Sequence, residues 1–180
     1  MTSRLIVIDL VASFIAFFLV LQSPVMGQDA GSLRGGASSL EETHQDWRVI
    51  CRVADGKKQC GISQQQTRKD GQRILTIELH NGPDNMLDGN LVLPFGLLFG
   101  TGVRIQIDEQ AAKNPLSFRT CFLAGCIVPL QFNPASRAAL RSGTALKVQA
   151  RTADGRDVAF SISLRGLSAA LDRIYTLMNG

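Results

Sequence analysis

Several stretches of this chain alternate apolar and polar residues with a period of two, which is the pattern of a β-strand with one buried face. The alternation is clearest at 47–53, 73–80 and 103–107. A strong turn signal, Asp55-Gly56, follows the first stretch and predicts a tight hairpin with a returning strand. The pattern therefore predicts a mainly antiparallel β-structure.

The register of this first hairpin follows from its turn. Counting outward from Asp55-Gly56 places Cys51 opposite Cys60. Val49 then lies opposite Ile62 on the same face. We expect the two Cys residues to form a non-hydrogen-bonded pair, in which facing side chains approach most closely.

Two further strand–turn–strand units are predicted, at 116–132 and at 146–162. In the first, a short connection between Cys121 and Cys126 sets these residues opposite each other. In the second, a three-residue loop with Gly155 in the left-handed conformation keeps the apolar residues of both strands on one face. The pairs predicted for this hairpin are Leu146 with Ile162, Val148 with Phe160, Ala150 with Val158, and Arg151 with Asp157.

Two helices are predicted. Asn133 caps the first, with Pro134 at its first position and Gly143 past its end. The second covers Leu167 to Met178, where apolar residues recur at helical spacing. It is expected to pack on the sheet, with a helix lying on a membrane as the alternative.

Polar and Gly-rich stretches divide the chain. Residues 28–46 are predicted to be a flexible linker, and 63–72 and 81–89 to be loops. Pro94 and the glycines that follow it predict bends or bulges within 91–108. The predicted fold is an antiparallel β-sandwich or flattened barrel, with one short helix and a C-terminal helix, over residues 47–180.

The first 27 residues have the layout of a secretory signal peptide. Arg4 precedes an unbroken apolar run of twelve residues, Leu10 to Leu21. Val25-Met26-Gly27 then provides a small-residue exit, which predicts cleavage between Gly27 and Gln28. A retained membrane anchor is the alternative. The signal predicts export to the periplasm, the cell surface or the medium.

Charge argues against a nucleic-acid-binding protein. The formal net charge is +4, and the basic residues are scattered along the chain. A basic surface of this kind is compatible with anionic lipid or acidic partners. Contact with a membrane is expected only at its surface.

The four cysteines are expected to form disulfides, because an even number in an exported chain is typical of a disulfide framework. Three connectivities are possible, and the two turns favour Cys51–Cys60 and Cys121–Cys126. Such short closures stabilise by about 2–3 kcal/mol each. A zinc site is disfavoured because, of the spacings C-x8-C and C-x4-C, at least one is wider than the usual two to four residues, and because the expected compartment is oxidising.

No catalytic, cofactor-binding or metal site is predicted. The two histidines, His44 and His80, lack a nucleophile motif such as G-x-S-x-G. The glycines of 96–102 lack the Lys-Ser/Thr of a phosphate-binding loop. The acidic residues Asp84, Asp88, Asp108 and Glu109 lack the ordered spacing of a calcium loop.

Four segments taken together resemble the invasion-associated locus B (IalB) family of exported bacterial proteins. They are Trp47-Arg48-Val49-Ile50-Cys51, the LPFGLLFGTGVRIQID segment at 93–108, the Cys121-to-Gly125-Cys126 hairpin, and Ser163-Leu164-Arg165-Gly166-Leu167. The resemblance runs from about residue 47 to 171. It implies an envelope or secreted location and a link to host-cell invasion, and it carries no catalytic residues.

The expected function is therefore binding, to an unknown protein or envelope component, without a small-molecule cofactor. The loops at 63–72 and 81–89 are the predicted recognition segments, since long polar loops on a β scaffold often carry recognition. Function is expected to survive loss of both histidines. The alternatives are a hydrolase with an unrecognised site and a periplasmic assembly or inhibitor protein.

Overall fold

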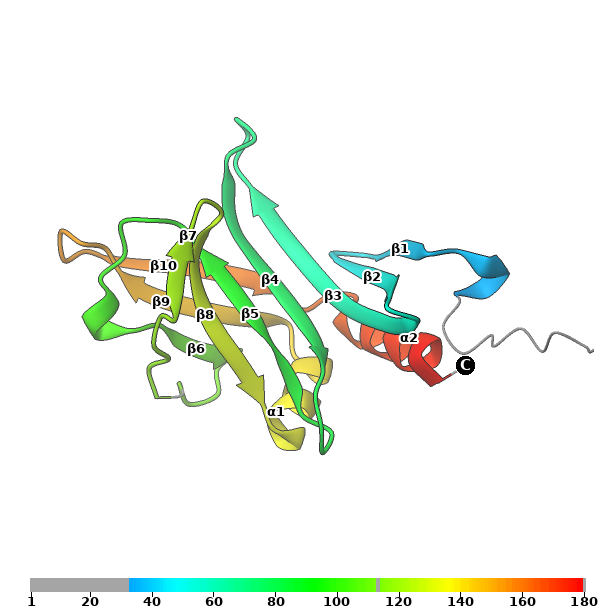
Figure 1. Cartoon of the computed structure of the whole chain (residues 1–180). Coiled ribbons are helices and arrows are strands. Elements are labelled where there is room, and N and C mark those ends of the chain that lie inside the picture. The colour runs from blue at the N-terminus through cyan, green and yellow to red at the C-terminus, as the bar shows by residue number, and fades with distance from the viewer. Residues whose placement is uncertain (1–32, 113, 180) are drawn as a thin grey trace, which may run out of the picture.

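Ten strands form two antiparallel sheets in the computed structural model, which describes residues 33–112 and 114–179 (Figure 1). The larger sheet has the order β1-β2-β3-β4-β5-β8-β7, and the smaller has the order β10-β9-β6. The strands of the larger sheet are β1 Ser39–His44, β2 Trp47–Ala54, β3 Lys57–Thr67, β4 Arg73–Asn81, β5 Leu87–Leu93, β8 Gly125–Phe132 and β7 Thr120–Phe122. Those of the smaller sheet are β10 Asp157–Ser163, β9 Ala145–Arg151 and β6 Arg104–Ile107. The predicted antiparallel β-sandwich is confirmed.

Two α-helices complete the fold, as predicted. Helix α1, Pro134–Ser142, begins after Asn133, whose side chain accepts a hydrogen bond from the backbone N–H of Ser136 at 2.8 Å. Helix α2, Leu167–Asn179, buries Leu167, Leu171 and Ile174. Short 3-10 turns lie at Arg34–Gly36 (η1) and Phe99–Thr101 (η2).

The hairpin registers that the sequence predicts are present. Cys51 pairs with Cys60 across β2 and β3, and Cys121 pairs with Cys126 across β7 and β8. All four pairs predicted for the β9–β10 hairpin occur, including Arg151 with Asp157. Turn chemistry and one-sided burial thus determine pairing locally.

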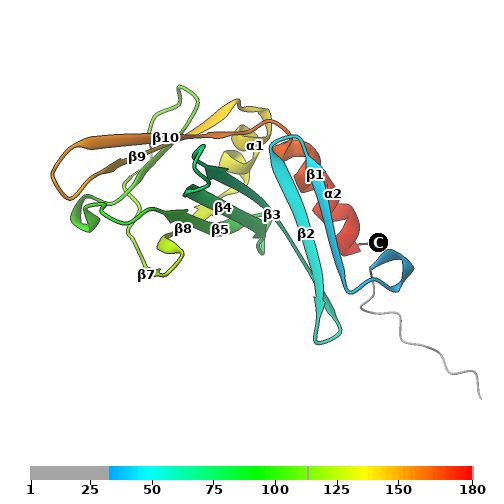
Figure 2. The same ribbon diagram turned by 90° about the horizontal axis from the view of Figure 1, so that it is seen from above.

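The inner face of the larger sheet packs against two different parts of the molecule (Figures 1 and 2). Helix α2 packs on β1, β2 and β3, whereas the smaller sheet and α1 lie over the strands beyond β3. One core connects both parts, and its largest side chain, Trp47, has no exposed surface. Strand β3 therefore contacts both α2 and strand β10 of the smaller sheet.

The two sheets are joined at the backbone carbonyl of Ser163, which is the last residue of β10 and precedes α2. Its oxygen accepts hydrogen bonds from Trp47 Nε1 and from Gln64 Nε2, each at 2.9 Å. Gln66 Nε2 donates to the neighbouring Ser161 carbonyl at 2.8 Å. Side chains from β2 and β3 thereby satisfy the free edge of β10, which would otherwise leave shielded carbonyls unpaired.

The turn between β1 and β2 fits against the start of α2. The Ser163 hydroxyl donates to Asp46 Oδ2 at 2.6 Å. Gly166 has a φ of 87°, and a Cβ at this position would overlap the carbonyl of His44. Only glycine combines this conformation with this approach. We call Trp47, Gln64, Ser163 and Gly166 the Ser163 junction.

Three predicted boundaries are wrong. The predicted linker at 28–46 contains β1, an edge strand that pairs along its whole length with β2, so Ser39–His44 is structured. Residues 28–32 lie outside the described part. The predicted loop at 63–72 is strand up to Thr67, because its polar residues Gln64 and Gln66 bond to the backbone of β10. The predicted loop at 81–89 spans only 82–86, since β5 begins at Leu87.

The junction generates a stability prediction. Replacing Gln64 by Leu removes a donor from a shielded carbonyl and should lower the free energy of unfolding by about 1–3 kcal/mol. Replacing the neighbouring Gln65, which is exposed on the other face of β3, by Leu should change it by about 0.5 kcal/mol or less. Urea unfolding of both variants provides the comparison. Equal effects at the two positions would show that the junction adds no stability.

Candidate functional site

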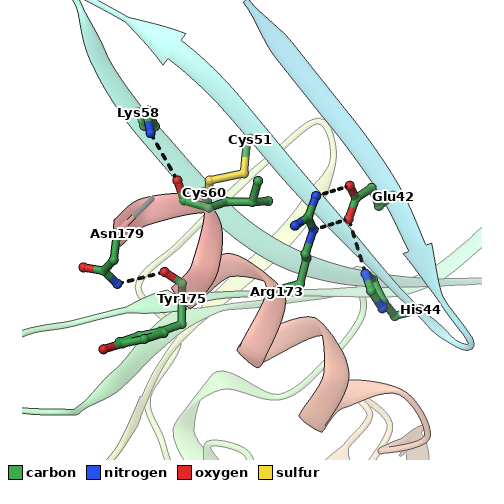
Figure 3. The surroundings of a disulfide bond; sticks show 9 residues. Glu42, His44, Cys51, Lys58, Cys60, Arg173, Tyr175 and Asn179 are labelled. Atoms are coloured by element: carbon green, nitrogen blue, oxygen red, sulfur yellow. Dashed lines mark hydrogen bonds and ion pairs between the residues drawn. A yellow bond between two sulfur atoms is a disulfide. The ribbon is translucent and has the colours of Figure 1, made fainter. Parts of the chain in front are cut away.

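Each predicted disulfide joins two adjacent strands. Cys51–Cys60 links β2 to β3 with a Cα–Cα distance of 4.1 Å, and Cys121–Cys126 links β7 to β8 with one of 4.0 Å. None of the four cysteines is free. Figure 3 places the first disulfide against the last turns of α2, where Lys58 Nζ donates to the Leu177 carbonyl at 3.4 Å.

An ion-pair clasp holds the middle of α2 to β1 (Figure 3). Arg173 donates two hydrogen bonds to the Glu42 carboxylate, from Nε and Nη2, both at 2.7 Å. His44 Nε2 lies 3.5 Å from the same carboxylate. The Arg173 guanidinium holds the pKa of Glu42 below its ordinary value, against the opposing effect of burial, and His44 adds to the lowering. His44 therefore supports the fold rather than lying in a linker.

A cleft opens where the first half of β3 diverges from β4. Strand β3 pairs with β2 from Lys57 onward but with β4 only from Ile62 onward, and the last turn of α2 lies behind the gap (Figure 1). The cleft has a volume of about 600 Å³. We call it the β3–β4 cleft. Its lining combines charged, polar and apolar residues: Arg52, Lys58, Glu78, His80, Gln59, Ser63, Asn81, Ile50, Cys60, Gly61, Ile62, Leu79 and Met178.

The disulfide and α2 keep the walls of this cleft in place. Cys60 belongs to the lining and is tied to Cys51, so the diverging half of β3 cannot separate from β2. Lys58, which also lines the cleft, is tied to α2 through Leu177. The cleft is a preorganised surface that does not depend on a mobile loop.

Two polar atoms in the cleft are shielded and have no hydrogen-bond partner among the described residues: Ser63 Oγ and Asn81 Oδ1. Ser63 is only 5% exposed. Two more such atoms, Thr76 Oγ1 and Asp88 Oδ1, belong to the neighbouring strands β4 and β5. Unpaired shielded polar groups cost free energy, and a bound partner that supplies hydrogen bonds removes that cost.

The structure does not assemble a catalytic triad from the residues available. Ser63, His80 and Asp88 lie on the same face of the larger sheet, and His80 pairs with Asp88 across β4 and β5. Within the described part of the chain, no hydrogen bond joins any two of these side chains, and no ion pair involves His80. The nucleophile–base contact that activates a serine is not formed.

The acidic residues considered for calcium are spread over three places. Asp108 accepts hydrogen bonds from the backbone N–H of Thr144 and Ala145, at 3.1 and 2.8 Å. Asp84 lies in the β4–β5 turn, and Asp88 lies in β5. Glu109 pairs with Lys147 at 2.5 Å. Residues 33–112 and 114–179 contain no group of three His, Cys, Asp or Glu side chains placed to hold a metal ion.

A second hollow, smaller in volume, lies on the exposed face of the smaller sheet. Its volume is about 460 Å³, and its lining includes Arg104, Gln149, Arg151 and Asp157. Arg151 is paired with Asp157 at 3.0 Å. Its polar atoms are already engaged or open to solvent, so it is the weaker candidate.

The sequence analysis missed the β3–β4 cleft. Arg52 lies on β2, and Glu78 and His80 lie on β4, so the lining residues come from strands on either side of β3, and no local pattern of the sequence indicates that they share a cleft. The Glu42–Arg173 clasp was missed for the same reason, since its partners are 131 residues apart. The missed signal was the polar alternation of Glu42 and His44, which places both on one face of a short strand.

Two antiparallel sheets and two disulfides, each joining adjacent strands, define a disulfide-braced β-sandwich domain. The model of the family described as "Invasion associated locus B (IalB) protein" matches residues 47–175. The chain therefore belongs to the invasion-associated locus B family, which confirms the resemblance drawn from the sequence.

Named relatives agree. An Invasion protein B homolog of Brucella abortus (strain 2308) is 45% identical over 150 residues, which cover 82% of this chain and 86% of that protein. The Invasion protein B of Bartonella bacilliformis is 30% identical over 175 residues, covering 91% of this chain and 94% of that protein. The crystal structure of invasion associated protein b from Bartonella henselae superposes with a TM-score of 0.73 at 35% identity, covering 77% of this chain and 97% of that one.

Two features of the structure bear on the cellular compartment of the protein. Among the described residues, no helix is long and apolar enough to cross a membrane. Two disulfides are typical of an exported protein. The predicted signal peptide and its cleavage at Gly27–Gln28 lie outside the described residues.

The ion pair between Glu42 and Arg173 predicts that the stability of the fold depends on pH. Because the pKa of Glu42 is lower in the folded than in the unfolded state, its contribution to stability is present above the unfolded pKa and is lost as pH falls through the folded pKa. At pH 7 the Glu42→Gln variant should be less stable than the native chain, and the difference should shrink as the pH falls through the lowered pKa of Glu42 in the folded state.

Glu41→Gln provides the matched control. Glu41 lies on the same strand as Glu42, and its exposed carboxylate pairs with Arg48 of β2. Exposed ion pairs add little stability. Urea unfolding across the pH range measures all three proteins. A difference between Glu42→Gln and the native chain that is independent of pH would contradict the account.

Proposed function

We propose that this chain is an exported, non-enzymatic binding protein whose β3–β4 cleft receives a segment of a protein partner, in the cell envelope or on a host cell. The observation that carries the proposal is the cleft itself, with the unpaired polar atoms Ser63 Oγ and Asn81 Oδ1 in its wall. Rotation of the two side chains toward a bound segment would give these atoms partners and remove the cost of leaving them unpaired.

The composition of the cleft favours a polypeptide over a single charged ligand. Arg52 and Lys58 provide positive charge, whereas Glu78 provides negative charge in the same wall. Ile50 and Met178 add apolar surface. A lining with both signs of charge, amide groups and apolar side chains matches the mixed chemistry of a peptide segment.

The names of the relatives indicate the biological process in which this chain could act. The proteins of Brucella abortus and Bartonella bacilliformis are named for invasion, which favours a role in host interaction for this chain. The predicted signal peptide and the disulfides favour the periplasm or the cell surface as its location. Envelope function in a bacterium that does not invade is compatible with the same binding mechanism.

The alternative of a hydrolase is less well supported. His80 is the one histidine in the described residues that faces the cleft, and it makes no hydrogen bond to Ser63 or Asp88. A general base must reach the proton that it abstracts.

The test uses a strain that lacks the gene, complemented with single variants. Ser63→Ala should leave the unfolding free energy unchanged or higher, since it removes an unpaired hydroxyl, yet it should weaken partner binding by about tenfold. Arg52→Glu should abolish the phenotype that the gene restores. His80→Gln should preserve it, because an amide can replace an imidazole in hydrogen bonding but not as a base.

Arg104→Glu, on the exposed face of the smaller sheet, is the matched control and should remain functional. A folded His80→Gln variant without function would contradict a binding role and reopen a catalytic or metal role for His80. Full function in Arg52→Glu would exclude the cleft as the binding site.

A further inference from the structure

Five large apolar side chains are exposed at the end of the molecule that carries β7, in two neighbouring loops. Phe95, Leu98 and Phe99 follow β5, whereas Phe122 ends β7 and Leu123 lies in the turn between β7 and β8. Leu123 is fully exposed at 101%, and Phe95 is 62% exposed. We call these five residues the apolar tip.

The two loops lie side by side and are firmly held. Leu93, at the end of β5, pairs with Cys126, which brings Phe95 close to the β7–β8 turn. The ring of Phe99 stacks on Phe118, which leads into β7, with ring centroids 4.6 Å apart. The Cys121–Cys126 disulfide closes the hairpin below Leu123.

The loop after β5 is also anchored to the smaller sheet. The Leu98 backbone N–H donates to the Arg151 carbonyl at 2.7 Å, and the Gly96 carbonyl accepts from Ala153 at 2.8 Å. Leu97 is buried between the exposed residues. The phenylalanines therefore project from a fixed backbone, and their exposure does not come from a loose loop.

Turn chemistry does not account for the residues at the tip. A two-residue hairpin turn favours Asn, Asp or Gly, whereas this turn carries Leu123 and Ala124. A leucine with its whole side chain in water adds nothing to the core. Several such residues together are typical of a contact surface.

The β9–β10 turn lies beside the tip, since the backbone N–H of Ala153 donates to the Gly96 carbonyl. At the neighbouring β9–β10 turn, Asp154 and Asp157 are paired with arginines.

Two cations lie next to the apolar residues and have no ion pair among the described residues. Arg73 Nη2 donates to the carbonyl of Ala124, within the β7–β8 turn, at 2.5 Å. Arg119 is exposed, and its backbone pairs with Ile127 beside Phe118. Apolar side chains rimmed by free cations match the interface of a bilayer that carries anionic headgroups.

We propose that the apolar tip docks this protein on an anionic lipid bilayer, with Phe95, Phe122 and Leu123 inserted between the headgroups and Arg73 and Arg119 over the phosphates. This membrane contact goes beyond the proposed binding function. It uses a different surface, since Arg73 begins β4 near the tip whereas His80 lies near the other end of β4, in the cleft. A docked protein keeps the β3–β4 cleft accessible to its partner.

The test uses the chain from Gln28, which contains every described residue and lacks the apolar run of the signal, with sedimentation of large unilamellar vesicles. Vesicles of phosphatidylcholine and phosphatidylglycerol at 7:3 should bind the protein, and phosphatidylcholine alone should bind it at least about fivefold less. Phe122→Ser with Leu123→Ser should lower binding about tenfold or more. Leu123 is fully exposed and Phe122 is half exposed, so the variant should stay folded with at most a small fall in its thermal midpoint.

Tyr175→Ser is the matched control. Tyr175 is an exposed large side chain of α2, which packs on β1, β2 and β3 near the edge of the larger sheet that lies away from β7 (Figure 2). This variant should bind vesicles like the native chain. A second readout is a tryptophan reporter: emission from Leu123→Trp should shift to the blue with anionic vesicles, and emission from Tyr175→Trp should not.

Three results would overturn the proposal. The first is no binding to anionic vesicles by the native chain, which would assign the apolar tip to a protein partner or to a second copy of this chain. The second is equal loss of binding in the tip variant and the α2 control. The third is a blue shift at position 175 but not at 123. None of them bears on the cleft variants, so the two proposals fail separately.

Discussion

The hydrogen bonds to the backbone carbonyl of Ser163 join the end of β10 to the larger sheet. This carbonyl accepts hydrogen bonds from Trp47 and Gln64, so the chain leaving β10 is tied to β2 and β3 at once. Helix α2 begins four residues later, at Leu167, and this tie fixes where it starts. The close contact of Gly166 with His44 then seats the β1–β2 turn. One carbonyl thereby positions the helix that the first three strands wrap around.

The position of α2 in turn creates the cleft. The first half of β3, before Ile62, pairs with β2 against α2 and does not pair with β4. The Cys51–Cys60 disulfide stabilises the separated half, and the Glu42–Arg173 clasp holds β1 to the same helix. The second disulfide stands beside the apolar tip. Each disulfide therefore braces a strand pair next to one of the two proposed contact surfaces.

Local features of this fold could be predicted from the sequence, and features made by distant segments could not. The Asp55-Gly56 turn and the alternation of apolar residues were sufficient to pair Cys51 with Cys60. The polar residues in the second half of β3 are typical of a loop, and nothing nearby in the sequence indicates that Gln64 and Gln66 bond to β10. The sequence of β1 resembles a linker because a short edge strand needs few apolar residues. The cleft required the three-dimensional course of β3, which no window of the sequence contains.

Site-specific photocrosslinking in the native cell tests the central claim, that the β3–β4 cleft is where the partner binds. A photoreactive residue replaces Gln59, which is exposed in the cleft, or Gln149, which is exposed in the hollow of the smaller sheet. The account predicts one discrete protein adduct from position 59, reduced by Arg52→Glu in the same chain, and none from position 149. An adduct from position 149 alone, or one at position 59 that is insensitive to Arg52→Glu, would contradict it.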